Sequence, residues 1–119
     1  MPDFSKIELS ESTDGRQINI TATGTAGNLI HTALSATGPD NYDEVWLYAS
    51  NVSDADTLIT VEWGGVSDPG DLIKVAISPE VGLGLLVPGL ILQNALALRV
   101  FAEDNLVVNI SGFVNRITA

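Results

Sequence analysis

The sequence predicts an all-β fold: an antiparallel β-sandwich, jelly-roll-like or immunoglobulin-like, with about eight strands and almost no helix. Three observations lead to this prediction. Apolar and polar residues alternate with a period of two, and several segments are rich in β-branched and aromatic residues. Turn-forming residues separate these segments at short intervals. The 119 residues suit one domain, which we place at residues 13–119, with residues 1–12 as a candidate amino-terminal arm.

The amino-terminal third contains three candidate strands. Residues 4–9 and 28–34 supply two of them. Residues 16–22 alternate most clearly, with their apolar side chains on one face. Residues 26–37 also allow a turn or two of helix, because several of their apolar residues would share a helical face. Strand and helix both stay open for this segment.

The remaining strands are expected to form three hairpins, because turn-like residues separate each pair. The expected pairs are 44–49 with 58–63, 72–77 with 81–87, and 95–102 with 106–110.

Residues 81–98 carry no charge and approach the length of a membrane-spanning helix. Several glycines and Pro88 interrupt this stretch, however, and such residues break helices. We therefore expect two short strands around a turn at Pro88 and Gly89, and no membrane partner.

The amino-acid composition limits the classes of function that the chain can have. Hydrophobic residues make up 45% and charged residues 17% of the chain, so it has enough apolar residues to build a core. Fifteen acids against five bases give a net charge of −10, which repels polyanions, so we expect no nucleic-acid partner. No cysteine is present to form a disulfide or a thiolate zinc site. The amino terminus does not read as a secretory signal, so we expect synthesis in the cytoplasm.

The sequence offers little for catalysis, and we expect no enzyme, no metal and no cofactor. His31 is the single histidine, and no Gly-x-Ser-x-Gly motif accompanies it, so packing or hydrogen bonding explains it better than nucleophilic catalysis. Glu62 is expected on the outward face of its strand. The other grouped acids lie in turns, where Asp commonly binds backbone amides, and their spacing does not match a calcium loop. These groups are Asp54 with Asp56, Asp68 with Asp71, and Asp40 with Asp43 and Glu44.

Aromatic side chains are the candidate interaction residues. Trp46, Tyr48 and Trp63 are suited either to packing or to a platform for a carbohydrate or a protein partner. Three apolar positions are expected to point outward and to leave apolar surface for subunit packing. They are Leu83, Leu85 and Val107.

Four segments together resemble small virion proteins of tailed phages, especially marine ones. They are residues 41–51 (NYDEVWLYASN), 62–65 (EWGG), 87–92 (VPGLIL) and 112–117 (GFVNRI). The resemblance covers the later part of the chain and is of the capsid decoration or cement type. It implies a β-rich protein on the outer capsid surface, often trimeric at local three-fold positions. The motifs are structural, so the resemblance assigns no functional residue.

These considerations lead to one expected function and one alternative. We expect a non-enzymatic virion protein, located on the capsid surface, that cements the shell by binding across neighbouring subunits of the major capsid protein. We also expect it to form a homo-oligomer, preferably a trimer. The alternative is a receptor- or carbohydrate-binding module of a head or tail fibre, which would use the candidate aromatic residues.

Overall fold

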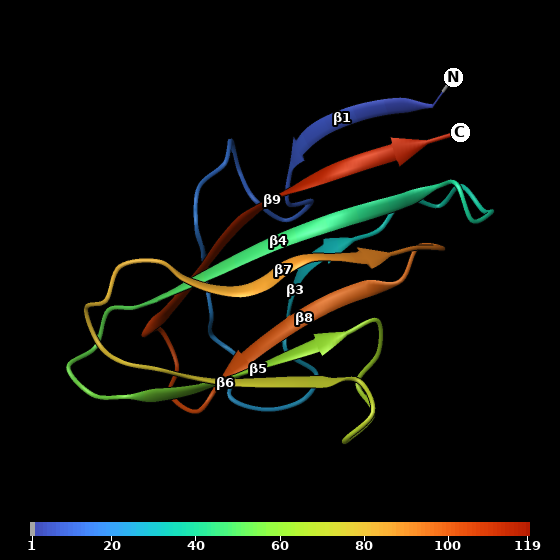
Figure 1. Ribbon diagram of the computed structural model, residues 1–119. Coiled ribbons are helices and arrows are strands. Elements are labelled where there is room, and N and C mark those ends of the chain that lie inside the picture. Colours follow the sequence, from blue (N-terminus) through green and yellow to red (C-terminus); the bar gives the residue numbers. More distant parts are fainter. Residues whose placement is uncertain (1) are drawn as a thin grey trace.

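The computed structural model describes residues 2–119, which form nine strands in two antiparallel sheets. Sheet A has the order β1 (Asp3–Glu8), β9 (Val108–Thr118), β4 (Tyr42–Asn51), β7 (Gly84–Leu92), and β2 (Ile18–Asn19) also pairs with β9. Sheet B has the order β3 (Asn28–Thr32), β8 (Ala97–Ala102), β5 (Thr57–Trp63), β6 (Leu72–Ile77). Residues 2–119 contain no helix, and so none that could cross a membrane. The predicted all-β sandwich is confirmed (Figure 1).

The strands pair in a nested order. In sheet A, β2 pairs with β9 and β4 with β7, and in sheet B, β3 pairs with β8 and β5 with β6. The chain thus behaves like one long hairpin rolled into two sheets. This is the topology of a jelly roll, one of the two sandwich types that the sequence predicts.

All three predicted hairpins are wrong, because the two strands of each pair lie in different sheets. The links β4–β5, β6–β7 and β8–β9 cross from one sheet to the other. The buried side chain of Asn51 fixes the first crossing, since its Nδ2 donates to the carbonyl oxygens of Ala55 at 2.8 Å and Ile77 at 3.0 Å. Turn residues indicate that the chain reverses, but they do not indicate which sheet it enters next.

Strand β7 corrects a second expectation. Pro88 and Gly89 do not form a turn between strands, because β7 continues through them from Gly84 to Leu92. β7 is an edge strand, so one of its sides has no neighbouring strand. Proline lacks the backbone N–H, and on that side no N–H is needed for pairing. The pairing with β4 shifts at this point, so the proline sits at an irregularity in the strand.

Other boundaries also differ from the prediction. The ambiguous segment 26–37 contributes strand β3 and no helix. The strand expected at 16–22 is reduced to two residues, whereas the one expected at 106–110 continues to Thr118. Within the candidate arm, the described residues include β1, which pairs with β9 of its own chain; Met1 lies outside the described residues.

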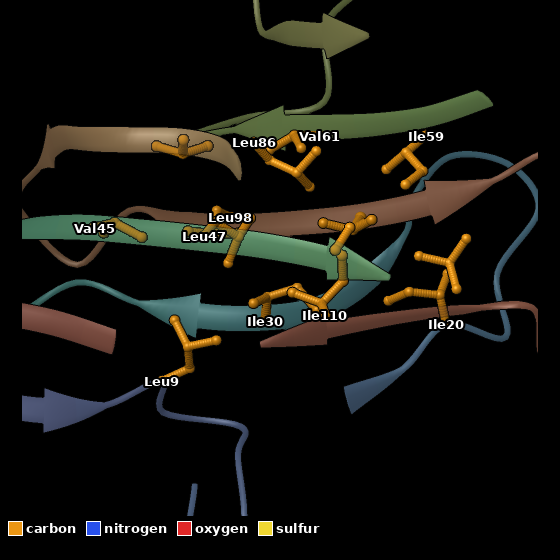
Figure 2. Packing of buried hydrophobic residues seen from close by; sticks show 14 of the residues in the cluster. Leu9, Ile20, Ile30, Val45, Leu47, Ile59, Val61, Leu86, Leu98 and Ile110 are labelled. Carbon is orange, nitrogen blue, oxygen red and sulfur yellow. The ribbon is translucent and has the colours of Figure 1, made fainter. Parts of the chain in front are cut away.

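The core lies between the two sheets (Figure 2). Strand β4 shows how the sequence fills it, because its inward positions are all buried and alternate with half-buried ones. Each fully buried aliphatic side chain stabilises the fold by about 1.5–3 kcal/mol. Among the expected outward residues, Leu83 and Leu85 are exposed, but Val107 is partly buried and packs against the core. The fully buried aliphatic side chains include Ile20, Ile30, Val45, Leu47, Ile59, Val61, Val87, Leu98, Val100 and Ile110.

Candidate functional site

The outward side of sheet A is the candidate site. In an antiparallel pair, directly opposed residues share a face, so the register shows which side chains lie together there. We call this surface the open face. It comprises Phe4, Lys6 and Glu8 of β1, Phe113, Asn115 and Ile117 of β9, Tyr42, Glu44, Trp46 and Tyr48 of β4, and Leu85 and Ile91 of β7.

The structure brings together two of the three predicted interaction aromatics. Trp46 and Tyr48 are two residues apart on β4 and share the open face. Trp63 lies on sheet B, at the end of β5, where it packs against the core. A platform made from all three side chains is therefore not formed within one copy of the chain.

Trp46 is held in place at the centre of the open face. Its ring lies nearly parallel to that of Phe113, with centroids 6.1 Å apart, and Lys6 Nζ lies 4.4 Å from the Phe113 centroid. The ring also occupies the space that a side chain at Gly89 would need, since an added Cβ would lie 3.0 Å from it.

A carboxylate completes this arrangement. The indole N–H of Trp46 donates to Glu44 Oε1 at 2.7 Å, and Asn115 Nδ2 donates to the same oxygen at 3.1 Å. The bond from Trp46, followed by that from Asn115, lowers the pKa of Glu44. The centre of the face is thus ordered before any partner arrives.

The ends of the open face are more exposed than its centre. Phe4 at one end is 67% exposed, and Leu85 at the other end is 50% exposed. A hollow of about 370 Å³ adjoins the Phe4 end, lined by Pro2, Asp40, Tyr42, Ile117 and Ala119. A second, more polar hollow lies where β2 meets β9, lined by Gly15, Arg16, Gln17, Asn19 and Asn109.

The outward side of sheet B differs, because the chain itself covers part of it. Glu62 points away from the core, as expected, yet it is only 1% exposed, because another segment of the chain covers it. The loop between β2 and β3 crosses β8 and binds this carboxylate. Thr25 Oγ1 donates to it at 2.6 Å and the backbone N–H of Gly27 at 2.7 Å. Arg99 also holds the loop, since its guanidinium donates to the carbonyl oxygen of Gly27 at 3.2 Å.

A charged cluster joins the two sheets in the interior. Arg116 on β9 binds Asp43 on β4 through two hydrogen bonds, Nε to Oδ1 at 2.8 Å and an Nη to Oδ2 at 2.9 Å. Across the sandwich, His31 Nε2 lies 2.7 Å from Asp43 Oδ2. Asp43 and His31 are both fully buried.

The tautomer of His31 follows from its second contact. Its Nδ1 accepts a hydrogen bond from the backbone N–H of Ser10 at 2.9 Å, so the ring proton is on Nε2 and is donated to Asp43. Burial lowers the pKa of His31, although the hydrogen bond to Asp43 opposes this effect. Burial alone raises the pKa of Asp43, but the hydrogen bonds from Arg116 and His31 outweigh it and hold that pKa below its ordinary value. Both ring nitrogens of His31 are therefore engaged inside the fold.

The grouped acids of the loops do not converge. Asp43 points inward to Arg116 and Glu44 points to the open face, because neighbours on a strand alternate. Within residues 2–119, no cluster of three or more acids or histidines is placed to hold a metal ion. Asp71 instead accepts a hydrogen bond from the backbone N–H of Ser67.

Sequence reasoning missed Phe4 as a site residue and Asp43 as a buried charge. A signal existed for Asp43, since it shares the alternation of the buried Val45, Leu47 and Ala49. No comparable signal existed for Phe4. Nearly all residues of β1 are exposed, so the strand has no buried side from which the direction of the Phe4 side chain could be predicted.

Comparison with known proteins adds no relative: no family model, no curated protein and no solved structure matches this chain.

Proposed function

We propose that this chain is a non-enzymatic virion protein of a tailed phage that decorates the outer capsid surface and binds across neighbouring subunits of the major capsid protein. The phage assignment rests on the sequence resemblance. The binding role rests on one structural observation, the exposed apolar end of the open face.

That end presents a stripe of aliphatic side chains along an edge strand. Leu85 lies on β7, and Val81 and Leu83 lie in the link just before it; the three are 50%, 57% and 60% exposed. Leu85 lies opposite Tyr48, which continues the stripe onto β4. Adjacent exposed apolar side chains are typical of surfaces that bind other proteins. This stripe is our candidate capsid contact.

The interior supports a role without catalysis. His31 is the one side chain of the sequence that would titrate near neutral pH without a shift in its pKa, and its two nitrogens are bonded to Ser10 and Asp43 beneath the surface. A substrate could reach neither nitrogen without opening the sandwich. The cluster therefore suits stability better than acid–base chemistry.

The acidity of the chain fits assembly on a shell. A net charge of −10 keeps the protein soluble before it docks, because it opposes non-specific aggregation. Once docked, each copy that bridges capsid subunits stabilises the shell by mass action, because shell disruption must also break its contacts.

The test is an add-back experiment with particles from which this protein has been stripped. Wild-type protein should rebind in hundreds of copies spread over the shell, counted by quantitative mass spectrometry and located by cryo-electron microscopy. The double substitution Leu83→Glu with Leu85→Glu should abolish rebinding. Val52→Glu is the matched control, since Val52 is equally exposed but lies in the β4–β5 link. A few copies at a vertex or tail, or equal rebinding by the double variant, would contradict the proposal.

A second candidate is carbohydrate binding, favoured by the shared placement of Trp46 and Tyr48 on the open face. Jelly-roll folds occur in both viral capsid and lectin domains, so the topology does not decide between the two roles. Glycan binding should then be lost in Tyr48→Ala and Trp46→Ala, with circular dichroism to show that the variants remain folded. Binding that neither substitution changes would exclude stacking on this face.

A further inference from the structure

The amino-terminal end of the open face carries a projecting ring beside a hollow. Phe4 lies opposite Ile117, and Ile117 lies opposite Tyr42, so the three form one row across β1, β9 and β4. Ile117 and Tyr42 also line the hollow of about 370 Å³. A strongly exposed aromatic side chain and a partly apolar recess are therefore neighbours.

This pairing of a projection with a recess suits contact with a second copy of the same chain. A contact about a two-fold axis uses the same patch on both copies, so the patch must supply both the inserted group and the place that receives it. The hollow falls within the roughly 300–1,000 Å³ of sites that enclose small molecules, which leaves room for a phenyl ring.

Charges around the hollow favour the same occupant. Lys6 follows Phe4 by two residues on the same side of β1, which places it about 7 Å further along the strand. Asp40 lines the hollow and forms no ion pair with any described residue. Lys6 of one copy and Asp40 of another therefore carry opposite charges that a contact at this end could bring together.

The open face also minimises repulsion between copies. Besides Asp40 at the hollow, its charged side chains are one base, Lys6, and two acids, Glu8 and Glu44, on a chain whose net charge is −10. Both acids are already hydrogen-bonded within the chain, Glu8 to the backbone N–H of Gly15 and Glu44 to Trp46. Contact through this face therefore brings few like charges together.

From these observations we infer that the chain forms a two-fold pair through this end of the open face, with Phe4 of each copy inserted into the hollow of the other, beside Tyr42 and Ile117, and with Lys6 near Asp40. The inference does not depend on the capsid assignment. It differs from the trimer that the resemblance implies. It also leaves Leu85 free, because Tyr48, which lies opposite Leu85, is six residues or about 20 Å along β4 from Tyr42.

Analytical ultracentrifugation of the full chain over the micromolar range tests the pair. Wild-type protein should approach twice the monomer mass of 12.5 kDa as its concentration rises. Phe4→Ala should weaken association by about tenfold or more, as expected for a central aromatic anchor. Val52→Ala, at a position of similar exposure outside the face, should leave association unchanged.

A charge exchange tests the geometry itself. Lys6→Glu and Asp40→Lys should each weaken association, and the variant with both substitutions should recover most of it, because the opposite charges face each other again. A wild type that stays monomeric throughout, an assembly insensitive to Phe4→Ala, or a double variant that remains as weak as the single ones would overturn the inference. None of these results bears on rebinding to particles, which depends on Leu83 and Leu85.

Discussion

The two sheets present their outward sides very differently. On sheet B the loop between β2 and β3 folds over the strands and buries Glu62, whereas on sheet A the corresponding surface stays open and leaves Phe4 and Leu85 exposed. Each side carries an outward-pointing strand carboxylate that accepts two hydrogen bonds, Glu62 on sheet B and Glu44 on sheet A. The two carboxylates differ in their hydrogen-bond donors. Glu62 accepts from the loop that covers sheet B, whereas Glu44 accepts from side chains of sheet A itself. An outward strand position is therefore solvated only where no other segment returns to cover it.

The largest effect is expected at the charged cluster that holds both sheets in place. Asp43→Ala should lower the free energy of unfolding by about 3 kcal/mol, because it leaves the buried Nε2–H of His31 without an acceptor and removes the charge-assisted hydrogen bonds from Arg116, whose side chain is a third exposed. Urea denaturation followed by tryptophan fluorescence measures the change. Asp54→Ala, in an exposed loop, is the control and should stay within about 0.5 kcal/mol of wild type. A similar small loss for both variants would show that the cluster does not join the sheets.

Substitution of the two carboxylates, Glu62 and Glu44, tests the contrast between the covered and the open side. Glu62→Ala should cost about 2–3 kcal/mol, since it leaves the Gly27 N–H buried without an acceptor and releases the loop. Glu44→Ala should cost less than about 1 kcal/mol, because water can reach its former donors on the open face. Hydrogen exchange should show faster exchange of the Gly27 amide in the first variant alone. Equal costs at the two positions would contradict the contrast between a covered and an open side.

Two glycines of the covering loop provide a third test. Gly27→Ala should destabilise the fold by about 1–3 kcal/mol, because the added Cβ would lie 2.4 Å from the carbonyl oxygen of Val100 and must displace the loop from β8. Gly24→Ala in the same loop meets nothing within 4 Å and should be close to neutral. Thermal unfolding of both variants is the measurement. A neutral Gly27→Ala would mean that the loop does not lie tightly on sheet B.

The smallest predicted effect is a pH dependence of the free energy of unfolding. It arises between the two sheets and does not involve the outward side of either one. His31 has a lowered pKa, so below its ordinary value of 6.5 the unfolded chain takes up a proton that the folded chain refuses. Stability should therefore fall as the pH drops below this value, by at most about 1.4 kcal/mol per pH unit for one group. Asp43, whose pKa is also lowered, adds its own loss only below 3.8.

A variant without the imidazole isolates this contribution. The chain has no second histidine, so the slope of stability between about pH 6.5 and about pH 5 should largely disappear in His31→Gln. An unchanged slope in that variant would assign the dependence to carboxylates instead.

The local sequence pattern predicted the features that depend on a single strand and the turn beside it. The predicted strand at residues 44–49 is confirmed as part of β4, and turn residues correctly separated most strands. The predictions that failed concern contacts between segments that are far apart in the sequence. The three hairpins were wrong because the same turn residues serve a reversal within one sheet and a crossing between two; at the first crossing, the buried contacts of Asn51 hold the link between the sheets. The burial of Glu62 could not be predicted, because the residues that cover it, Thr25 and Gly27, lie more than thirty residues away in the chain.

The pairing of β1 with β9 has a mechanical consequence. Asp3 lies opposite Thr118, so the first and last strands run antiparallel and end side by side, as Figure 1 shows. A force that pulls these two ends apart acts along the hydrogen bonds of the ladder, which lie perpendicular to the strands. The bonds would then open one pair at a time from Asp3 towards Glu8, and the strand would peel away under a small load. The sandwich beneath it would withstand far more, because β4 and β9 are paired along their whole shared length, from Tyr42 with Ile117 to Asn51 with Val108.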